Sequence, residues 1–269
     1  MPAITNHSAP VPSRAAVQAN RLLAAMPHDA LERLLPYLER VTLAAGQTLY
    51  DGSDQLQHAY FPVNTIVTLM LSLNGLAPTK LALTGREGVV GISAFMGGAN
   101  YGCAVVLNKG EAFKIPAAVL KAEFDLNEAA MRLLLRFTQA LVTQMAQTAV
   151  CNRHHVVEQQ LCTWLLTCLD RLPQGNSLSA SNMAGGSRTG DSLRGDSLRI
   201  TQAMVASMLG VRREAISEAT VHLRAMGLIA SRRGRISLLD RPGLQARACE
   251  CYLVVKRETQ RLLPDRIAT

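Results

Sequence analysis

The sequence contains few aromatic residues and lacks any long apolar run. Aromatic residues make up 4% of the 269 residues, and Trp164 is the single tryptophan. No stretch of about 18 consecutive apolar residues occurs, so we expect neither a membrane-spanning helix nor a membrane partner. Residues 1–14 are polar, contain proline and lack the apolar segment of a secretory signal. These absences predict a cytoplasmic chain.

Cysteine is present but scattered through a chain of ordinary size, which fits reduced thiols. Cys249 and Cys251 could together bind a metal or sense redox state, but two ordinary thiols beside a packing helix would look the same. His154 and His155 could ligate haem or a metal, or they could end a helix, where positive charge favours the negative end of the dipole. The sequence therefore predicts no metal site. The cysteines are Cys103, Cys151, Cys162, Cys168, Cys249 and Cys251.

Positive charge is concentrated near the C-terminus. The formal net charge is +8. From Arg199 onward there are 13 Lys or Arg and 6 Asp or Glu, so +7 of that charge lies in the last quarter of the chain. A basic domain joined to a near-neutral one suits a polyanion such as nucleic acid, because Lys and Arg near phosphates release condensed counterions. A solvated basic surface would give the same count, so the motifs must decide between the two.

The hydropathy pattern divides the chain into a tail and two domains joined by a long helix. We expect residues 1–16 to form a disordered tail and residues 17–126 a domain of short strands. Residues 127–155 carry one long helical pattern. Residues 156–269 form a second domain, which includes a flexible Gly-, Ser- and Asn-rich loop at 173–198.

Short β-favouring runs separated by turn residues fill residues 41–115. Many short strands at this spacing predict a small antiparallel sandwich or a jelly-roll-like β-roll. The predicted runs are Val41–Tyr50, Ala59–Val63, Ile66–Leu73, Lys80–Leu83, Cys103–Leu107 and Ala112–Ile115.

The long helix carries two apolar stripes with alternating steps of three and four residues. One face can pack on the β-roll, while the other needs a further partner. A matching helix from a second subunit is the economical partner, although neighbours within one subunit could also bury it. The first stripe is Leu134, Phe137, Leu141, Gln144, Thr148 and Cys151, and its first five residues are the expected dimer contact. The second stripe is Met131, Leu135, Thr138, Val142, Met145 and Ala149.

Residues 200–229 have the pattern of a helix-turn-helix. Thr201 can cap the first helix, since its hydroxyl can accept a hydrogen bond from a free backbone N–H. Gly210 suits the left-handed conformation of the turn, and the second helix runs from Arg212 to Arg224. The opening turns of that second helix expose residues of the types that contact base edges and phosphates in the major groove. These residues are Arg212, Arg213, Glu214 and Ser217.

A basic hairpin follows the second helix. The segment containing Arg232, Arg233 and Arg235 leads into Ile236-Ser237-Leu238-Leu239, which predicts a two-stranded wing with a basic tip. Such a wing would meet the DNA backbone. Cap, turn glycine, basic second helix and basic wing together indicate double-stranded DNA as the partner.

At these residues the chain resembles the Crp/Fnr family of bacterial transcription regulators, over roughly residues 20–260. The resemblance implies an α+β fold with three parts: an N-terminal antiparallel β-roll like that of cyclic-nucleotide-binding domains, a long dimerisation helix, and a C-terminal winged helix-turn-helix. It also implies a homodimer that binds a two-fold operator and contacts RNA polymerase. Its most specific parts are Ile200–Ile229 and the continuation Ile236–Arg241.

The resemblance assigns contacts to several residues of the helix-turn-helix. Arg213 and Glu214 match the base-reading pair, with Arg213 taking a guanine and Glu214 accepting from a cytosine amine. Thr201 and Gln202 match positions that touch phosphate. The chain departs from the pattern at Glu218, where the family commonly has a second base-reading Arg, so we expect an unusual operator.

The sensor domain departs further from the family. The segment Arg86, Glu87, Gly88, Gly91 and Ser93 resembles the phosphate-binding cassette and is the candidate effector pocket, but Ile92 stands at the ribose-binding Glu. No Arg occurs between Arg86 and Arg132. A cyclic phosphate would lack its bidentate partner, so we do not expect cyclic AMP to bind. The glycines could simply make tight turns.

The same resemblance bears on an iron–sulfur cluster. The branch of the family that holds one has several cysteines near the N-terminus, and none precedes Cys103 here. We therefore expect no iron–sulfur cluster, and no other cofactor is indicated with certainty.

The sequence favours a dimeric transcription regulator controlled by an unknown signal, and no enzyme activity. A cupin-like enzyme would need a His and Glu metal cluster, yet the predicted roll holds only His58. A ligand-independent or architectural DNA binder is an alternative, but the Arg213–Glu214 pair and the wing argue for sequence reading. A redox- or metal-sensing regulator is the further alternative.

Overall fold

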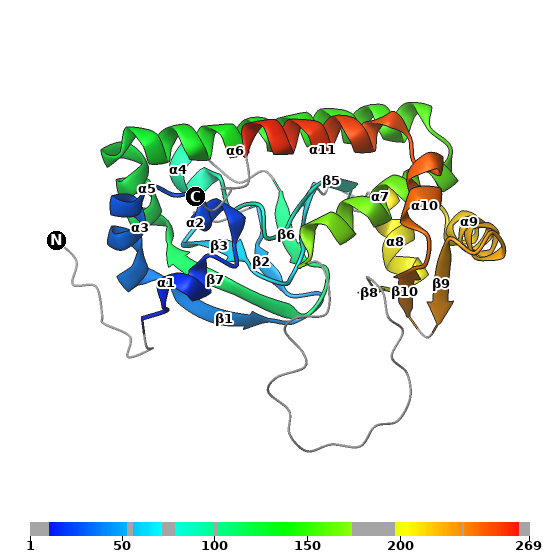
Figure 1. Cartoon of the computed structure of the whole chain (residues 1–269), viewed down its shortest axis with the longest axis horizontal. Helices are drawn as coiled ribbons and strands as arrows, with labels where there is room; N and C mark the ends of the chain where they lie inside the picture. Colours follow the sequence, from blue (N-terminus) through cyan, green and yellow to red (C-terminus); the bar gives the residue numbers. More distant parts are fainter. Residues whose placement is uncertain are drawn as a thin grey trace, which may run out of the picture.

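The computed structural model describes residues 11–52, 56–71, 79–98, 102–173, 197–232 and 234–263. A β-roll with short helices lies at one end, and a smaller helical domain with its own sheet lies at the other (Figure 1). A long helix spans both parts, and the last helix of the chain runs beside it (Figure 1). This arrangement has the mixed α and antiparallel β architecture predicted from the sequence.

The N-terminal part begins with short helices and continues as an antiparallel roll. Three strands form one sheet in the order β1-β7-β3, and four form a second in the order β2-β6-β4-β5. The helices are α1 (Arg14–Val17), α2 (Arg21–Ala24), α3 (His28–Leu34), the 3₁₀ turn η1 (Leu35–Tyr37), α4 (Ser93–Met96) and α5 (Ala117–Leu126). The strands are β1 (Glu39–Leu43), β2 (Thr48–Tyr50), β3 (His58–Pro62), β4 (Val67–Leu71), β5 (Thr79–Thr84), β6 (Cys103–Val106) and β7 (Gly110–Pro116).

Ordered structure begins inside the stretch expected to be a disordered tail. Ser13 caps α1, because its hydroxyl accepts a hydrogen bond from the Ala16 N–H at 3.2 Å. Val17 is fully buried in the core of the roll. The prediction of disorder for residues 1–16 is therefore wrong from Ser13 onward, while residues 1–10 lie outside the described chain.

The C-terminal part follows the long helix. The expected span of 127–155 for that helix agrees with α6 (Glu128–His154), which Asn127 caps. The remaining elements are α7 (Val157–Arg171), β8 (Ser197–Arg199), α8 (Gln202–Leu209), α9 (Arg213–Ala225), β9 (Ile229–Arg232), β10 (Arg235–Leu238), α10 (Arg241–Arg247) and α11 (Glu250–Leu262).

The wing is a three-stranded sheet rather than the two-stranded hairpin predicted. Its order is β8-β10-β9, and Leu198 lies opposite Ile236. Both side chains are at least 96% buried, so the Ser-Leu-Arg alternation of β8 places one apolar residue in the core. The sequence pattern places Ser197 and Leu198 in the flexible loop at 173–198, and this tertiary pairing corrects that boundary. Residues 174–196 of the loop lie outside the described chain.

Two apolar cores hold the molecule together. The first fills the roll and includes the apolar side of the first half of α6. The second joins the four-stranded sheet, at Met70 and Leu83, to Trp164 of α7 and to the packed faces of α8 and α9. The helix-turn-helix thus packs directly on the four-stranded sheet of the roll. Among the described helices none is both long and apolar enough to span a bilayer.

Candidate DNA-binding interface

The helix-turn-helix is formed by α8 and α9, as the sequence predicts. The Thr201 hydroxyl accepts a hydrogen bond from the Met204 N–H at 3.2 Å, which caps α8. Gly210 ends α8 in the left-handed region, with φ of 66°. Val205 of α8 and Ile216 of α9 are fully buried and belong to the same core. This packing fixes the angle at which α9 leaves the domain.

The outward face of α9 carries the residues that the sequence singled out. Arg213, Glu214 and Glu218 are exposed, as is Arg212 at the N-cap position, while Ser217 is half-buried. Figure 1 places α9 at the end of the molecule opposite α1 and α3. The N-terminal turns of α9 are therefore free to enter a groove of DNA without obstruction from the β-roll.

One residue of this face escaped the sequence analysis. Val221 lies one turn after Ser217 on α9, and 59% of its surface is exposed. An exposed apolar side chain on a recognition face suits contact with a thymine methyl group. The i, i+4 spacing from Ser217 could have identified Val221, but the sequence analysis considered only charged and polar residue types.

The wing lies beside the start of α8. The Ile200 N–H donates to the Gly234 carbonyl at 2.8 Å, which ties the wing tip to the residue before Thr201. Thr201 is exposed and Gln202 half-buried at this point. Arg232 is exposed and Arg235 half-buried on the two paired strands, whereas Arg233 lies outside the described residues. The start of α8 and the wing therefore lie side by side, and both pack against α9.

Glu158 of α7 holds the far end of α9 in place. Its carboxylate pairs with His222 of α9 and, at 2.9 Å, with Arg247 of α10. Partial burial would raise the pKa of Glu158, but the hydrogen bonds from His222 and Arg247 outweigh it and lower the pKa. Charge pairing therefore supports the orientation that the apolar core sets.

The residues of the candidate effector pocket have separate structural roles. A Cβ on Gly88 would lie 2.1 Å from Cε2 of Phe137, so this glycine permits the close approach of α6. Gly91 has φ of 99° and makes a turn against Leu56, while Ser93 starts α4. The two glycines therefore have the structural roles that the sequence leaves open for them.

Arg86 and Glu87 line a cavity of about 550 Å³ between the N-terminal part and the C-terminal part of the chain. Glu87 pairs with the buried Arg171 of α7 at 2.9 Å. Cationic side chains outnumber anionic ones in this lining, so its chemistry suits an anion. Its charged residues are Arg21, Arg86, Glu87, Asp170, Arg171, Arg241 and Lys256.

The first stripe of α6 is buried within a single chain. Leu134, Phe137 and Leu141 are at most 3% exposed and belong to the core of the roll. The Gln144 Oε1 accepts a hydrogen bond from Arg171 at 3.1 Å, and Thr148 is half-buried. The expectation that this stripe forms the dimer contact is therefore corrected. The second stripe is the more exposed one.

The structure joins two sets of residues that the sequence analysis treated separately. Cys151 and His155 at the end of α6 meet Cys249 and Cys251 at the start of α11. Hydrogen bonds from Cys151 and Thr163 lower the pKa of Cys249 to about 5, whereas burial raises the pKa of Cys162 to about 12. The hydrogen bond with Cys249 raises the pKa of Cys151, and burial raises the pKa of Cys251, so Cys249 is the one thiol of the three that is shifted toward the thiolate.

Comparison with known proteins agrees with this geometry. Residues 159–247 match the Crp-like helix-turn-helix domain family. None of the curated protein sequences matches the chain. The protein is a DNA-binding transcription regulator, and its resemblance to the Crp/Fnr family is confirmed.

Several solved structures share the fold over most of the chain. FixK2 of Bradyrhizobium japonicum covers 79% of this chain and 98% of its own, with a TM-score of 0.61 and 14% identity. A CRP-family transcriptional regulator of Thermus thermophilus covers 77% and 96%, with a TM-score of 0.58 and 17% identity. The c-di-GMP-responsive regulator CLP of Xanthomonas campestris covers 80% and 100%, with a TM-score of 0.56 and 17% identity. At these identities the likeness establishes the fold alone.

Proposed function

We propose that the protein acts as a homodimer in the cytoplasm, with the α9 helix of each copy reading one half of a two-fold operator. The observation that carries the proposal is the exposed opening of α9, which presents Arg213 and Glu214 beside a basic wing. In this arrangement regulation proceeds through contact with RNA polymerase rather than through catalysis.

The chemistry of the face assigns a contact to each residue. Arg213 donates two hydrogen bonds to O6 and N7 of a guanine, and Glu214 accepts one from the amine of a cytosine. Val221 lies against a thymine methyl. Glu218 repels a phosphate or a base acceptor, so it selects against sites that place either one there.

Phosphate contacts position the protein without reading sequence. Arg212 lies at the N-terminus of α9, where backbone N–H groups and the helix dipole also favour an anion. Thr201, Gln202, Arg232 and Arg235 extend this basic and polar surface onto α8 and the wing. Arg233 belongs to the same segment by sequence.

The second stripe of α6 supplies the dimer contact. Leu135 is 39% exposed, and Val142, two turns further on, is 52% exposed. Val150 continues the apolar surface with 44% exposure. The spacing of seven residues between Leu135 and Val142 is that of helices that pair along their length.

The signal enters at the cavity between the two parts of the chain. Arg86 of the sensor domain and Lys256 of α11 both line it, so an anionic effector bound there would contact both parts at once. A ligand that favours one arrangement of the two parts shifts their equilibrium by the difference in its affinities. The missing cassette arginine still argues against cyclic AMP as this effector.

The reading function is tested with Arg213→Ala. Genome-wide binding-site mapping with the native protein identifies an operator, and fluorescence anisotropy then compares that operator with a scrambled duplex. The variant should lose about 1–3 kcal/mol of discrimination while keeping much of its non-specific affinity. Arg40→Ala is the matched control, because Arg40 is an exposed arginine on β1 that pairs with Glu111 at 2.7 Å. An unchanged affinity ratio in the Arg213 variant would contradict the proposal.

A further inference from the structure

Four metal-ligating side chains meet where α6 ends and α11 begins. The Sγ atoms of Cys151, Cys249 and Cys251 and a ring nitrogen of His155 all lie within 4.8 Å of one another. The three cysteines are buried, and 12% of the His155 side chain is exposed. Cys151 and Cys249 are 98 residues apart in sequence, so only the fold brings the set together.

Two of the separations are close to those of a tetrahedral zinc site. With Zn–S bonds of about 2.3 Å and Zn–N bonds of about 2.0–2.1 Å, two sulfur ligands lie about 3.8 Å apart, and sulfur and nitrogen lie about 3.6 Å apart. The Cys151 and Cys249 Sγ atoms are 3.6 Å apart, and the Cys251 Sγ lies 3.7 Å from Nδ1 of His155. We propose that these four residues bind one Zn²⁺ ion in a closed Cys₃His site.

The surrounding groups are those that support a bound metal. Nδ1 of His155 faces the thiols, and its Nε2 lies 3.3 Å from the carboxylate of Glu250. A carboxylate on the outer nitrogen fixes the ring and its tautomer, which is the usual partner of a zinc-bound histidine. The Thr163 hydroxyl lies 3.1 Å from the Cys249 Sγ and can donate to a thiolate. These two outer contacts therefore orient His155 and Cys249 toward the cluster.

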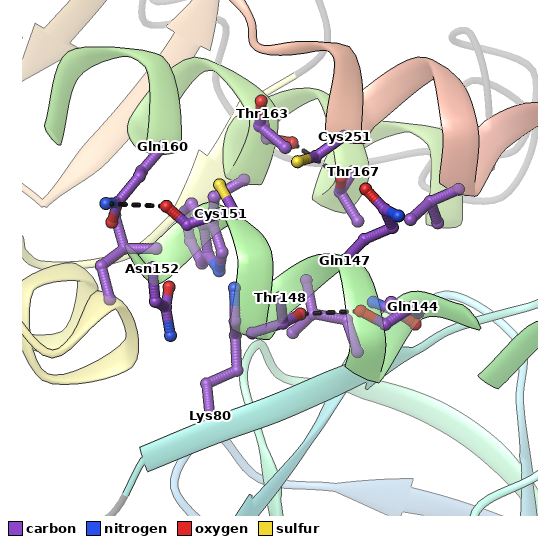
Figure 2. Close-up of a pocket in the computed structure, with 14 residues that line it drawn as sticks. Lys80, Gln144, Gln147, Thr148, Cys151, Asn152, Gln160, Thr163, Thr167 and Cys251 are labelled. Atoms are coloured by element: carbon purple, nitrogen blue, oxygen red, sulfur yellow. Dashed lines mark hydrogen bonds between the residues drawn. The ribbon is translucent and has the colours of Figure 1, made fainter. Parts of the chain in front are cut away.

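The backbone that carries the ligands is also held in place. The Gln160 side-chain amide donates to the carbonyl of His155 at 2.8 Å and to that of Cys151 at 3.3 Å. Figure 2 shows Gln160 on one side of Cys151, and Thr163 with Cys251 on another. Lys80 of β5 lines the same small pocket as Cys151 and Cys251 (Figure 2).

A disulfide explains fewer of these observations. Oxidation would join two of the three thiols and would leave the third thiol and His155 without a role. A zinc ion uses all four groups and, on binding, releases the thiol protons to solvent. The burial of three cysteines around one polar histidine therefore favours the metal.

The location of the site gives it a consequence for regulation. Cys151 and His155 belong to the helix that pairs the two copies, whereas Cys249 and Cys251 begin the helix that follows the winged domain. A bound ion would fix the angle between them and so the position of α9. This coupling rests on the proposed DNA-binding function, while zinc binding itself does not.

The experiment uses the full chain, reduced and stripped of metal. Zn²⁺ is titrated against a chromophoric chelator, and Co²⁺ serves as the spectroscopic probe. We expect one Zn²⁺ per chain, and a cobalt spectrum with thiolate charge-transfer bands and tetrahedral d–d bands. Cys249→Ser and His155→Ala should each weaken zinc binding at least about 100-fold, because loss of an outer partner alone costs about 10- to 100-fold.

Matched controls separate the site from general effects. Cys103→Ser and His154→Ala remove the same residue types outside the cluster and should bind zinc like the native chain. Circular dichroism tests whether each variant is folded. If Cys249→Ser does not fold, the cobalt spectrum of the native protein decides whether the site is tetrahedral with thiolate ligands. Absence of stoichiometric binding, an octahedral cobalt spectrum, equal losses in the controls, or a Cys151–Cys249 disulfide in freshly purified native protein would each overturn the proposal. Operator affinity is measured separately. A failure of the proposed DNA-binding function would therefore be distinguished from a failure of zinc binding.

Discussion

Arg171 is a buried side chain that connects several parts of this molecule. It ends α7, is 7% exposed, and donates to the Leu83 carbonyl of β5 at 3.2 Å. It also donates to Gln144 of α6 at 3.1 Å and pairs with Glu87 at 2.9 Å. A buried guanidinium is tolerated only when its charge and donors are satisfied, and here three separate elements satisfy them.

The first prediction concerns this arginine. Arg171→Met should lower the free energy of unfolding by about 3 kcal/mol or more, because Glu87 would remain as a buried charge without its partner. Chemical denaturation measures the change. The double variant Glu87→Gln with Arg171→Met should recover part of the loss. Arg132→Met, which removes an exposed arginine paired with Glu128, should cost less than about 1 kcal/mol. A loss in Arg171→Met no larger than in this control would contradict the role.

Single residues also show what a sequence can predict. Thr201, Gly210 and Arg213 could be placed correctly because a cap, a left-handed turn and an exposed helix opening are local features. Arg171 could not be identified, since its partners come from distant segments that only the fold brings together. The same reason separates Cys151 from Cys249 in the sequence analysis.

At the scale of elements, α6 has one buried face and one exposed face. One face packs in the core of the roll and against α7, and the opposite face exposes Leu135, Val142 and Val150. The helix was predictable from its periodicity, but periodicity alone could not say which stripe the single chain would bury. The closing strand β8 was missed because three residues after a polar loop give too short a pattern.

The exposed face of α6 gives the second prediction. Val142→Asp should raise the dimer dissociation constant at least about 100-fold, because an unpaired carboxylate would be buried between two helices. Sedimentation velocity measures the change. Tyr37→Asp provides the control, since Tyr37 is 40% exposed on η1, away from α6. A native protein that sediments as a monomer, or a Val142 variant that dimerises normally, would refute this assignment.

At the scale of the whole molecule, the DNA-binding domain shares its core with the β-roll. Met70 and Leu83 of the four-stranded sheet pack in the same cluster as Trp164 and as Leu209 of α8. Any change that moves this sheet therefore moves the helix-turn-helix as well. Both the charged cavity with Arg86 and the Cys₃His cluster span the same junction, so both are placed to alter the position of α9.

The central claim is that two copies of α9 read a two-fold site. In-vitro selection from a random DNA library with the purified full-length protein tests it most directly. We predict an inverted repeat whose half-sites lie about 10–10.5 base pairs apart, centre to centre, or a multiple of that distance. Each half-site should contain the guanine and cytosine that Arg213 and Glu214 contact. Recovery of no enriched motif, or of a single asymmetric half-site, would contradict the account.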